Sequence, residues 1–166
     1  MKHVVFLCLI LLLVVACGPT VAPATSSGPS ARATDTPTPA SDEEAILQLL
    51  AAEAEGVVQQ DIDRLMDLWA PDSLVTDANH TPDDPSDDLV WKGAEAIKER
   101  YLVIFQSFPT QAAHPDVELT ISGDNAEATT TTTIGIDMAP KGDKWTFVKI
   151  EGRWYITSLT FNLEKE

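Results

Sequence analysis

The chain has 166 residues, of which 26 are acidic and 11 basic, so its formal net charge at pH 7 is −15. This excess of negative charge repels nucleic acid and anionic lipid headgroups, and it disfavours functions that depend on binding either one. The two cysteines, Cys8 and Cys17, both lie in the first 17 residues. The rest of the chain therefore has no means of forming a disulfide, a cysteine-based metal site or a catalytic thiol.

The first 17 residues predict export. Lys2 and His3 precede an unbroken apolar run of 13 residues, 4–16. This length suits a signal-peptide core and falls short of the ~20 residues that span a bilayer. The sequence Val14-Val15-Ala16-Cys17 resembles the lipobox of bacterial lipoproteins. The resemblance implies that the signal peptide 1–16 is removed, that Cys17 is acylated, and that the protein is anchored to the outer face of the cell membrane. An ordinary secretory signal is the alternative.

Residues 17–40 are predicted to be the lipidated cysteine and a disordered tether. Of the 23 residues 18–40, 20 are Gly, Pro, Thr, Ser or Ala. Such a composition buries too little apolar surface to offset the entropy of ordering. As a flexible coil this segment reaches ~25 Å. A domain is expected over 41–166.

Three helices are predicted in the first part of this domain. Ser41 and Glu44 form a capping box, and apolar residues then recur at helical spacing up to Val58. Asp61 caps a shorter helix that carries Trp69 on its apolar face and ends at Pro71. The third helix is expected over 94–108, where Pro109 stops it. Between the last two helices we expect a strand at 73–78, an acidic loop at 79–88 and a brief extended piece at 89–91.

After the third helix the hydrophobic period changes from 3.6 to 2. Strands are expected at 117–121, 126–138, 145–150 and 153–163, joined by turns at Gly123-Asp124-Asn125, 140–143 and Glu151-Gly152. The fold class is therefore α+β, with an antiparallel meander that is covered on one face by the helices.

Four segments in this order, 59–77, 91–108, 117–131 and 149–161, resemble the nuclear transport factor 2-like superfamily, which includes SnoaL-like and ketosteroid isomerase-like proteins. The resemblance implies a cone, in which a curved antiparallel sheet wraps around the N-terminal helices and opens at one end to an apolar pocket. Members include enzymes, non-catalytic binders and dimer-forming adaptors, so the fold leaves the function open.

Asp77 and His114 are the candidate catalytic residues. A carboxylate and an imidazole that face one apolar cavity act as acid and base, and desolvation raises the pKa of the carboxylate. The isomerase-like relatives imply a tyrosine and a second acid at an oxyanion, and this chain does not reproduce that set. The alternatives are an exposed carboxylate at a strand end and a loop histidine before Pro115.

Large aromatic side chains are the candidates for lining a ligand pocket. Trp91 is the strongest of them, because it adjoins the acidic loop and Gly93. Packing in the core is the alternative for each. The full set is Trp69, Trp91, Tyr101, Phe105 and Trp154.

No cofactor or metal ion is predicted. The acidic run 83–88 lacks the residue spacing of a calcium-binding loop. The chain has no phosphate-binding loop, no nucleophile elbow and no zinc-protease motif, which disfavours kinases, dehydrogenases and hydrolases.

We therefore expect a surface lipoprotein, with the membrane as partner through its lipid, whose domain binds a small apolar ligand or a protein without catalysis. Two alternatives stay open. One is an enzyme of the SnoaL-like or isomerase-like kind that uses Asp77 and His114. The other is a structural module that dimerises through the sheet and binds no small ligand. The run Thr129–Thr133 suits such a contact, a polar pocket lining or a solvated outer face equally well.

Overall fold

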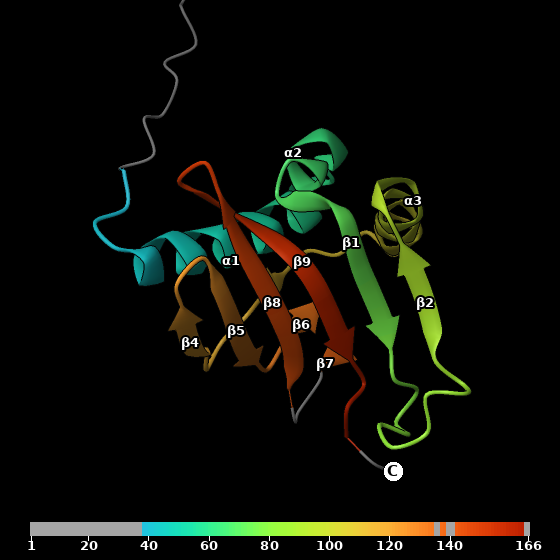
Figure 1. Cartoon of the computed structure of the whole chain (residues 1–166). Coiled ribbons are helices and arrows are strands. Elements are labelled where there is room, and N and C mark those ends of the chain that lie inside the picture. Colours follow the sequence, from blue (N-terminus) through green and yellow to red (C-terminus); the bar gives the residue numbers. More distant parts are fainter. Residues whose placement is uncertain (1–37, 135–136, 139–141, 165–166) are drawn as a thin grey trace, which may run out of the picture. The chain divides into compact units, whose positions relative to one another are not determined.

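The computed structural model describes residues 38–134, 137–138 and 142–164 (Figure 1). The predicted signal peptide, the predicted lipidation site Cys17 and residues 18–37 of the predicted tether lie outside the described residues. Within the described part, no helix has the length and the apolar character needed to cross a membrane.

The helices are α1 (Asp42–Gln59), α2 (Ile62–Met66) and α3 (Ala94–Phe105). Both predicted caps are confirmed. The Ser41 hydroxyl accepts the Glu44 backbone N–H at 3.1 Å, and the Asp61 carboxylate accepts the Arg64 N–H at 3.1 Å. These bonds satisfy amide groups that the first turn of a helix leaves without partners.

Two predicted helix boundaries were wrong. Trp69 does not continue α2, because it begins strand β1 (Trp69–Asp77), where it pairs with Ile156. Pro71 falls where the register of that pairing shifts, so its missing N–H breaks no regular ladder. The third helix ends at Phe105, and Phe108 is 74 % exposed at a φ of +49°. The following Pro109 disfavours helical geometry at residue 108.

A six-stranded sheet forms the other layer, in the order β2-β1-β9-β8-β5-β4. Its further strands are β2 (Leu89–Lys92), β4 (Glu118–Ser122), β5 (Asn125–Thr130), β8 (Asp143–Ile150) and β9 (Arg153–Phe161). Neighbours are antiparallel except β1 and β9, which are parallel. The predicted α+β class and the antiparallel run β4-β5-β8-β9 are thus confirmed.

The long strand predicted over 126–138 was wrong. β5 leaves the large sheet after Thr130, the last residue that pairs with β8. The chain then forms β6 (Thr133–Ile134) and β7 (Asp137–Met138), which join β3 (Ala112–Ala113) in a second, three-stranded sheet. The Thr131 backbone N–H donates to the Pro115 carbonyl at 3.2 Å, which draws this segment towards the chain that follows β3.

The core lies between the helices and the face of the sheet that they cover, as Figure 1 shows. In β5 the alternate residues Ala126, Ala128 and Thr130 are buried, so this side of the strand faces the core. Gly56 of α1 lies against Leu65 of α2, because a Cβ atom there would come within 2.9 Å of the leucine. The largest fully buried side chains are Trp145, Tyr101, Phe147 and Ile46.

Candidate functional site

A buried carboxylate–imidazole pair lies at the centre of the domain. Glu53 and His114 approach to 2.7 Å between Oε2 and Nε2, and each side chain is only 3 % exposed. Glu53 lies on the buried stripe of α1, four residues after Leu49 and four before Val57. His114 directly follows β3, whose pairing with β6 fixes its position.

Hydrogen bonds extend this pair in both directions. Tyr101 of α3 donates its hydroxyl to Glu53 Oε1 at 2.7 Å, and Trp69 donates its indole N–H to the Tyr101 oxygen at 3.2 Å. On the other side, His114 Nδ1 lies 2.9 Å from the hydroxyl of Thr132. Both Glu53 oxygens and both His114 nitrogens therefore have partners, so the network is satisfied internally.

The network fixes the charge of two of its members. Burial acts to raise the pKa of Glu53, but the hydrogen bond and charge of His114 and the hydroxyl of Tyr101 outweigh it and hold the pKa below its usual value. For Tyr101, burial and then the negative charge of Glu53 raise the pKa well above 10. At neutral pH Glu53 is a carboxylate and Tyr101 a neutral phenol.

A second buried acid, Asp143, lies at the start of β8 opposite Thr130. It is 2 % exposed, and its Oδ1 atom has no hydrogen-bond partner among the described residues. Burial raises the pKa of Asp143 to about 6, although the hydroxyl of Thr132 and the charges of His114 and Arg100 act in the opposite direction. Burial therefore keeps the proton on this carboxyl group to a higher pH than on an exposed aspartate.

A groove of about 450 Å³ runs between α1 and the segment 112–117. Small side chains such as Ala51 and Ala113 leave the space open, and His114 reaches the groove from the buried network. The volume lies in the range of small-molecule sites, about 300–1,000 Å³. The lining is mostly apolar and consists of Leu47, Leu50, Ala51, Ala54, Glu55, Val58, Gln59, Ala112, Ala113, His114 and Val117.

The carboxylate that meets His114 is Glu53, and the predicted pair of Asp77 with His114 is not formed. Asp77 Oδ1 accepts the Asn79 backbone N–H at 2.9 Å and the Asn162 side-chain N–H at 2.7 Å. These bonds join the ends of β1 and β9. Sequence reasoning missed Glu53, although its place between Leu49 and Val57 on the apolar stripe of α1 was the available signal.

The five predicted pocket aromatics do not line this groove. Trp69, Tyr101, Phe105 and Trp154 are buried in the core. Trp91 is half-buried and stacks on Phe161, with ring centroids 6.4 Å apart.

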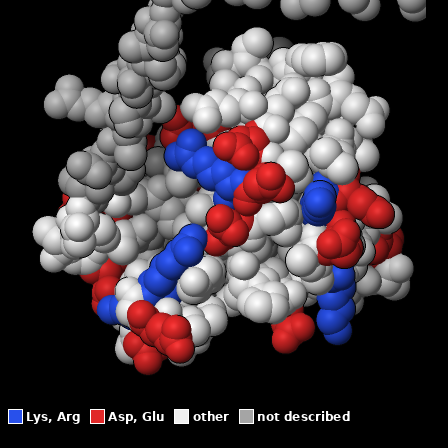
Figure 2. Space-filling view, turned by 90° about the horizontal axis from the view of Figure 1, so that it is seen from above, with Lys and Arg blue, Asp and Glu red and all other residues white. Residues whose placement is uncertain are grey.

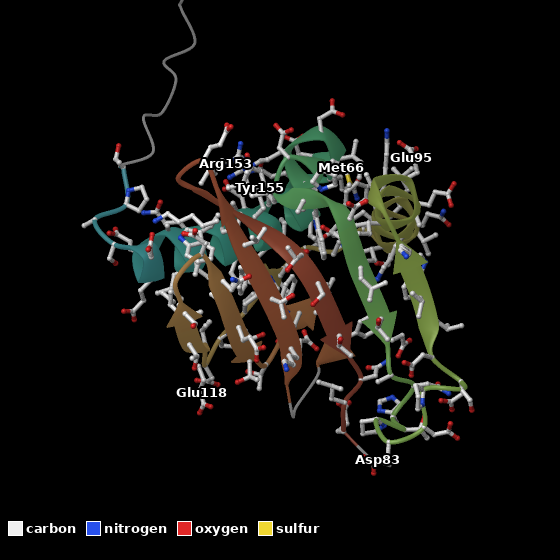
Figure 3. All side chains as sticks on the ribbon, viewed as in Figure 1. Met66, Asp83, Glu95, Glu118, Arg153 and Tyr155 are labelled. Atoms are coloured by element: carbon white, nitrogen blue, oxygen red, sulfur yellow. The ribbon has the colours of Figure 1, made fainter. Side chains whose placement is uncertain are left out.

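The acidic loop is held by its own hydrogen bonds. Asp87 accepts from Thr81 at 2.8 Å and from Asn79 at 3.1 Å, and Asp84 accepts from Ser86. Figure 3 labels Asp83 in this loop, between β1 and β2. Over the residues that the structure describes, no cluster of three or more acidic, histidine or cysteine side chains is placed to hold a metal ion.

No family model and no curated protein matches the sequence. Several solved structures, in contrast, have a similar fold. An NTF2-like protein with a cystatin-like fold from Novosphingobium aromaticivorans superposes with a TM-score of 0.58 at 18% identity, over 72% of this chain and 80% of that one. A protein of unknown function with a cystatin-like fold from Nostoc punctiforme gives 0.57 at 16% identity, over 72% and 89%. A candidate dehydratase of the NTF2-like family from Streptomyces avermitilis gives 0.53 at 21% identity, over 75% and 97%. At these identities the likeness establishes the NTF2-like fold and leaves the activity open.

Proposed function

We propose that this chain, with its NTF2-like fold, is a surface lipoprotein that binds a small apolar ligand in the groove beside α1, without catalysing a reaction on it. The observation that carries the proposal is the groove itself, which has about 450 Å³ of space and a mostly apolar lining. Acylation of Cys17 and the tether would display this domain outside the membrane. The lipobox-like sequence supports that part of the proposal.

The hydrogen bonds of the buried pair favour binding over catalysis. A general base acts on a proton within about 2.6–3.2 Å of its own atom. Both nitrogens of His114 are engaged by Glu53 and Thr132, and both oxygens of Glu53 are engaged by His114 and Tyr101. The pair therefore serves to fix His114 as part of the groove wall.

The lining also defines the ligand. From Leu47 to Val58 the groove follows α1 for about 16 Å at 1.5 Å per residue, which suits an elongated molecule. The described lining of the groove includes no lysine or arginine, and its one acid, Glu55, is paired with Arg64, so the groove wall offers no cationic side chain to an anion. We expect an uncharged, chain-like apolar ligand, with any polar end near Glu55 and Gln59.

A filling substitution tests the groove. Ala51 is exposed and lines it, so Ala51→Trp should occupy the space without disturbing the core. The neutral fluorescent probe N-phenyl-1-naphthylamine should bind the unaltered protein and bind Ala51→Trp at least about tenfold more weakly, a difference of ~1.4 kcal/mol. The matched control is Ala94→Trp, at an exposed alanine outside the groove. Equal binding by all three proteins contradicts the proposal.

An acid–base enzyme is the second candidate. The observation that favours it is that His114, paired with a buried carboxylate, reaches the groove. Native mass spectrometry of the protein from its own host distinguishes the two functions. A binder carries one molecule that stays unchanged on incubation. An enzyme converts it, and the Glu53→Gln variant does not.

A further inference from the structure

Three side chains from three elements meet on one face of the sheet, and none of them lines the groove. Arg100 of α3 places its Cζ atom 4.8 Å from the ring centroid of Phe161 and 5.5 Å from that of Trp91. The two rings are inclined by 22° to each other. Trp91 pairs with Val75 and Phe161 with Asp77, two residues further along β1, so both rings face the same side of the sheet.

Arg100 has no hydrogen-bond or ion-pair partner among the residues that the structure describes, although acids far outnumber bases in this chain. Arg64 is paired with Glu55, and Arg153, labelled in Figure 3, donates to the Asp67 carbonyl at 2.8 Å. Basic side chains on the face seen in Figure 2 likewise lie beside acidic ones. Within the described part of the chain, Arg100 forms no hydrogen bond and no ion pair, only the two ring contacts.

Arg100 acts on two acids without an observed bond to either one. Its charge acts to lower the pKa of both Glu53 and Asp143, so the three groups share one electrostatic environment. Glu53 is already bound by His114 and Tyr101. The Asp143 Oδ1 atom is buried and has no partner, and it makes no bond to Arg100. Arg100 is therefore half-buried, and its N–H donors have no acceptor among the described residues.

We propose that Arg100, which lies against the stacked rings of Trp91 and Phe161, binds the carboxylate group of a small organic acid. The ring contacts hold the guanidinium by its charge and use none of its N–H donors, from which a carboxylate accepts two parallel hydrogen bonds. The surrounding acidic excess favours a singly charged carboxylate over a phosphate that carries two charges. This site shares no residue with the groove and goes beyond the proposed function.

The site is tested on the full chain with sodium benzoate as the probe and uncharged benzamide as its matched isostere. Titrations are followed by calorimetry and by the indole N–H signal of Trp91 in NMR, at constant ionic strength. Benzoate should bind at one saturable site, and benzamide at least about tenfold more weakly, the loss expected when the paired, charge-assisted hydrogen bonds are removed. Benzoate that binds no better than benzamide overturns the proposal.

Variants assign the binding to Arg100. Arg100→Gln and Arg100→Lys should each lose about tenfold or more in benzoate affinity, because lysine has no planar fork. Lys98→Gln removes the same charge from α3 two residues earlier, where the side chain does not face the same direction, and should change affinity less than about twofold. Benzoate binding that survives both Arg100 variants contradicts the assignment. If Arg100→Gln fails to unfold cooperatively, Arg100→Lys carries the test.

The same variants separate this proposal from the proposed function. Arg100→Gln should leave N-phenyl-1-naphthylamine binding in the groove unchanged, and Ala51→Trp should leave benzoate binding unchanged. A loss of benzoate binding with the apolar probe retained therefore reports on Arg100 alone.

Discussion

Replacing Glu53 should show how much the buried network contributes to stability. In Glu53→Ala, His114 Nε2 and the Tyr101 hydroxyl both lose an acceptor in a site where the side chains are almost fully buried. An unsatisfied buried polar group costs about 1–3 kcal/mol, and breaking a buried ion pair costs about 3–5 kcal/mol. We therefore expect the free energy of unfolding to fall by about 3–5 kcal/mol.

Glu53→Gln is the matched control for this loss. The glutamine oxygen can still accept from Tyr101, and its amide can donate to His114 Nε2 once the imidazole proton moves to Nδ1 and donates to Thr132. What is lost is the charge assistance of the hydrogen bonds, roughly 1–2 kcal/mol. Urea unfolding at pH 7, followed by tryptophan fluorescence, measures both variants. Equal losses, or a loss below about 1 kcal/mol in Glu53→Ala, would refute the buried and charged network.

Three further perturbations have defined outcomes. Asp143→Asn should stabilise the protein by up to about 3 kcal/mol at pH 7.5 and by little at pH 4. The pKa of Asp143 is raised to about 6 from 3.8, so the folded state binds the proton more tightly than the unfolded state and loses stability as the pH rises through that range. Urea unfolding at both pH values measures the effect, and a pH dependence of stability that Asp143→Asn leaves unchanged contradicts it. Gly56→Ala should lower the free energy of unfolding by about 1 kcal/mol. Crowding of the added methyl group against Leu65 costs about 1–3 kcal/mol, which exceeds the gain of about 1 kcal/mol in helix propensity. A higher melting temperature would show that Leu65 moves aside. Cys17→Ser should release the protein from the membrane fractions of its host. Each buried CH₂ of an acyl chain contributes about 0.8 kcal/mol to membrane binding, and the serine variant would carry no acyl chain. Sedimentation of this variant with membranes contradicts the lipoprotein proposal.

The local signals in the sequence were enough for the class of the fold. Each cap bond, at Ser41 and at Asp61, joins two residues that lie three apart in the chain, so it does not depend on distant partners. The alternation along 117–121 and the turn at Gly123 likewise define a hairpin by local geometry. The order of the three helices and of the strands of the large sheet followed from such patterns, whereas the NTF2-like fold was expected from the resemblance of four segments.

Tertiary pairing decided what the local patterns left ambiguous. Trp69 fits the apolar face of a helix, and only its pairing with Ile156 makes it the start of β1. Five consecutive threonines suit any strand, so the sequence carried no mark of the point where β5 leaves the large sheet for β6. Propensity is local, whereas the partner of a strand is chosen by the whole fold.

The candidate sites show the same division. The sequence by itself identified His114 as a candidate site residue, but it led to Asp77 as the predicted partner. Asp77 was chosen because it lies at the end of an expected strand, a position that can be recognised from the sequence. Glu53 lies 61 residues from His114, and only packing of β3 against α1 brings the two together. The sequence singled out Trp91 beside Gly93, yet the contacts among Trp91, Arg100 and Phe161 join β2, α3 and β9. A sequence records which groups are present; the free energy of burying them, which depends on every neighbour at once, determines which groups meet.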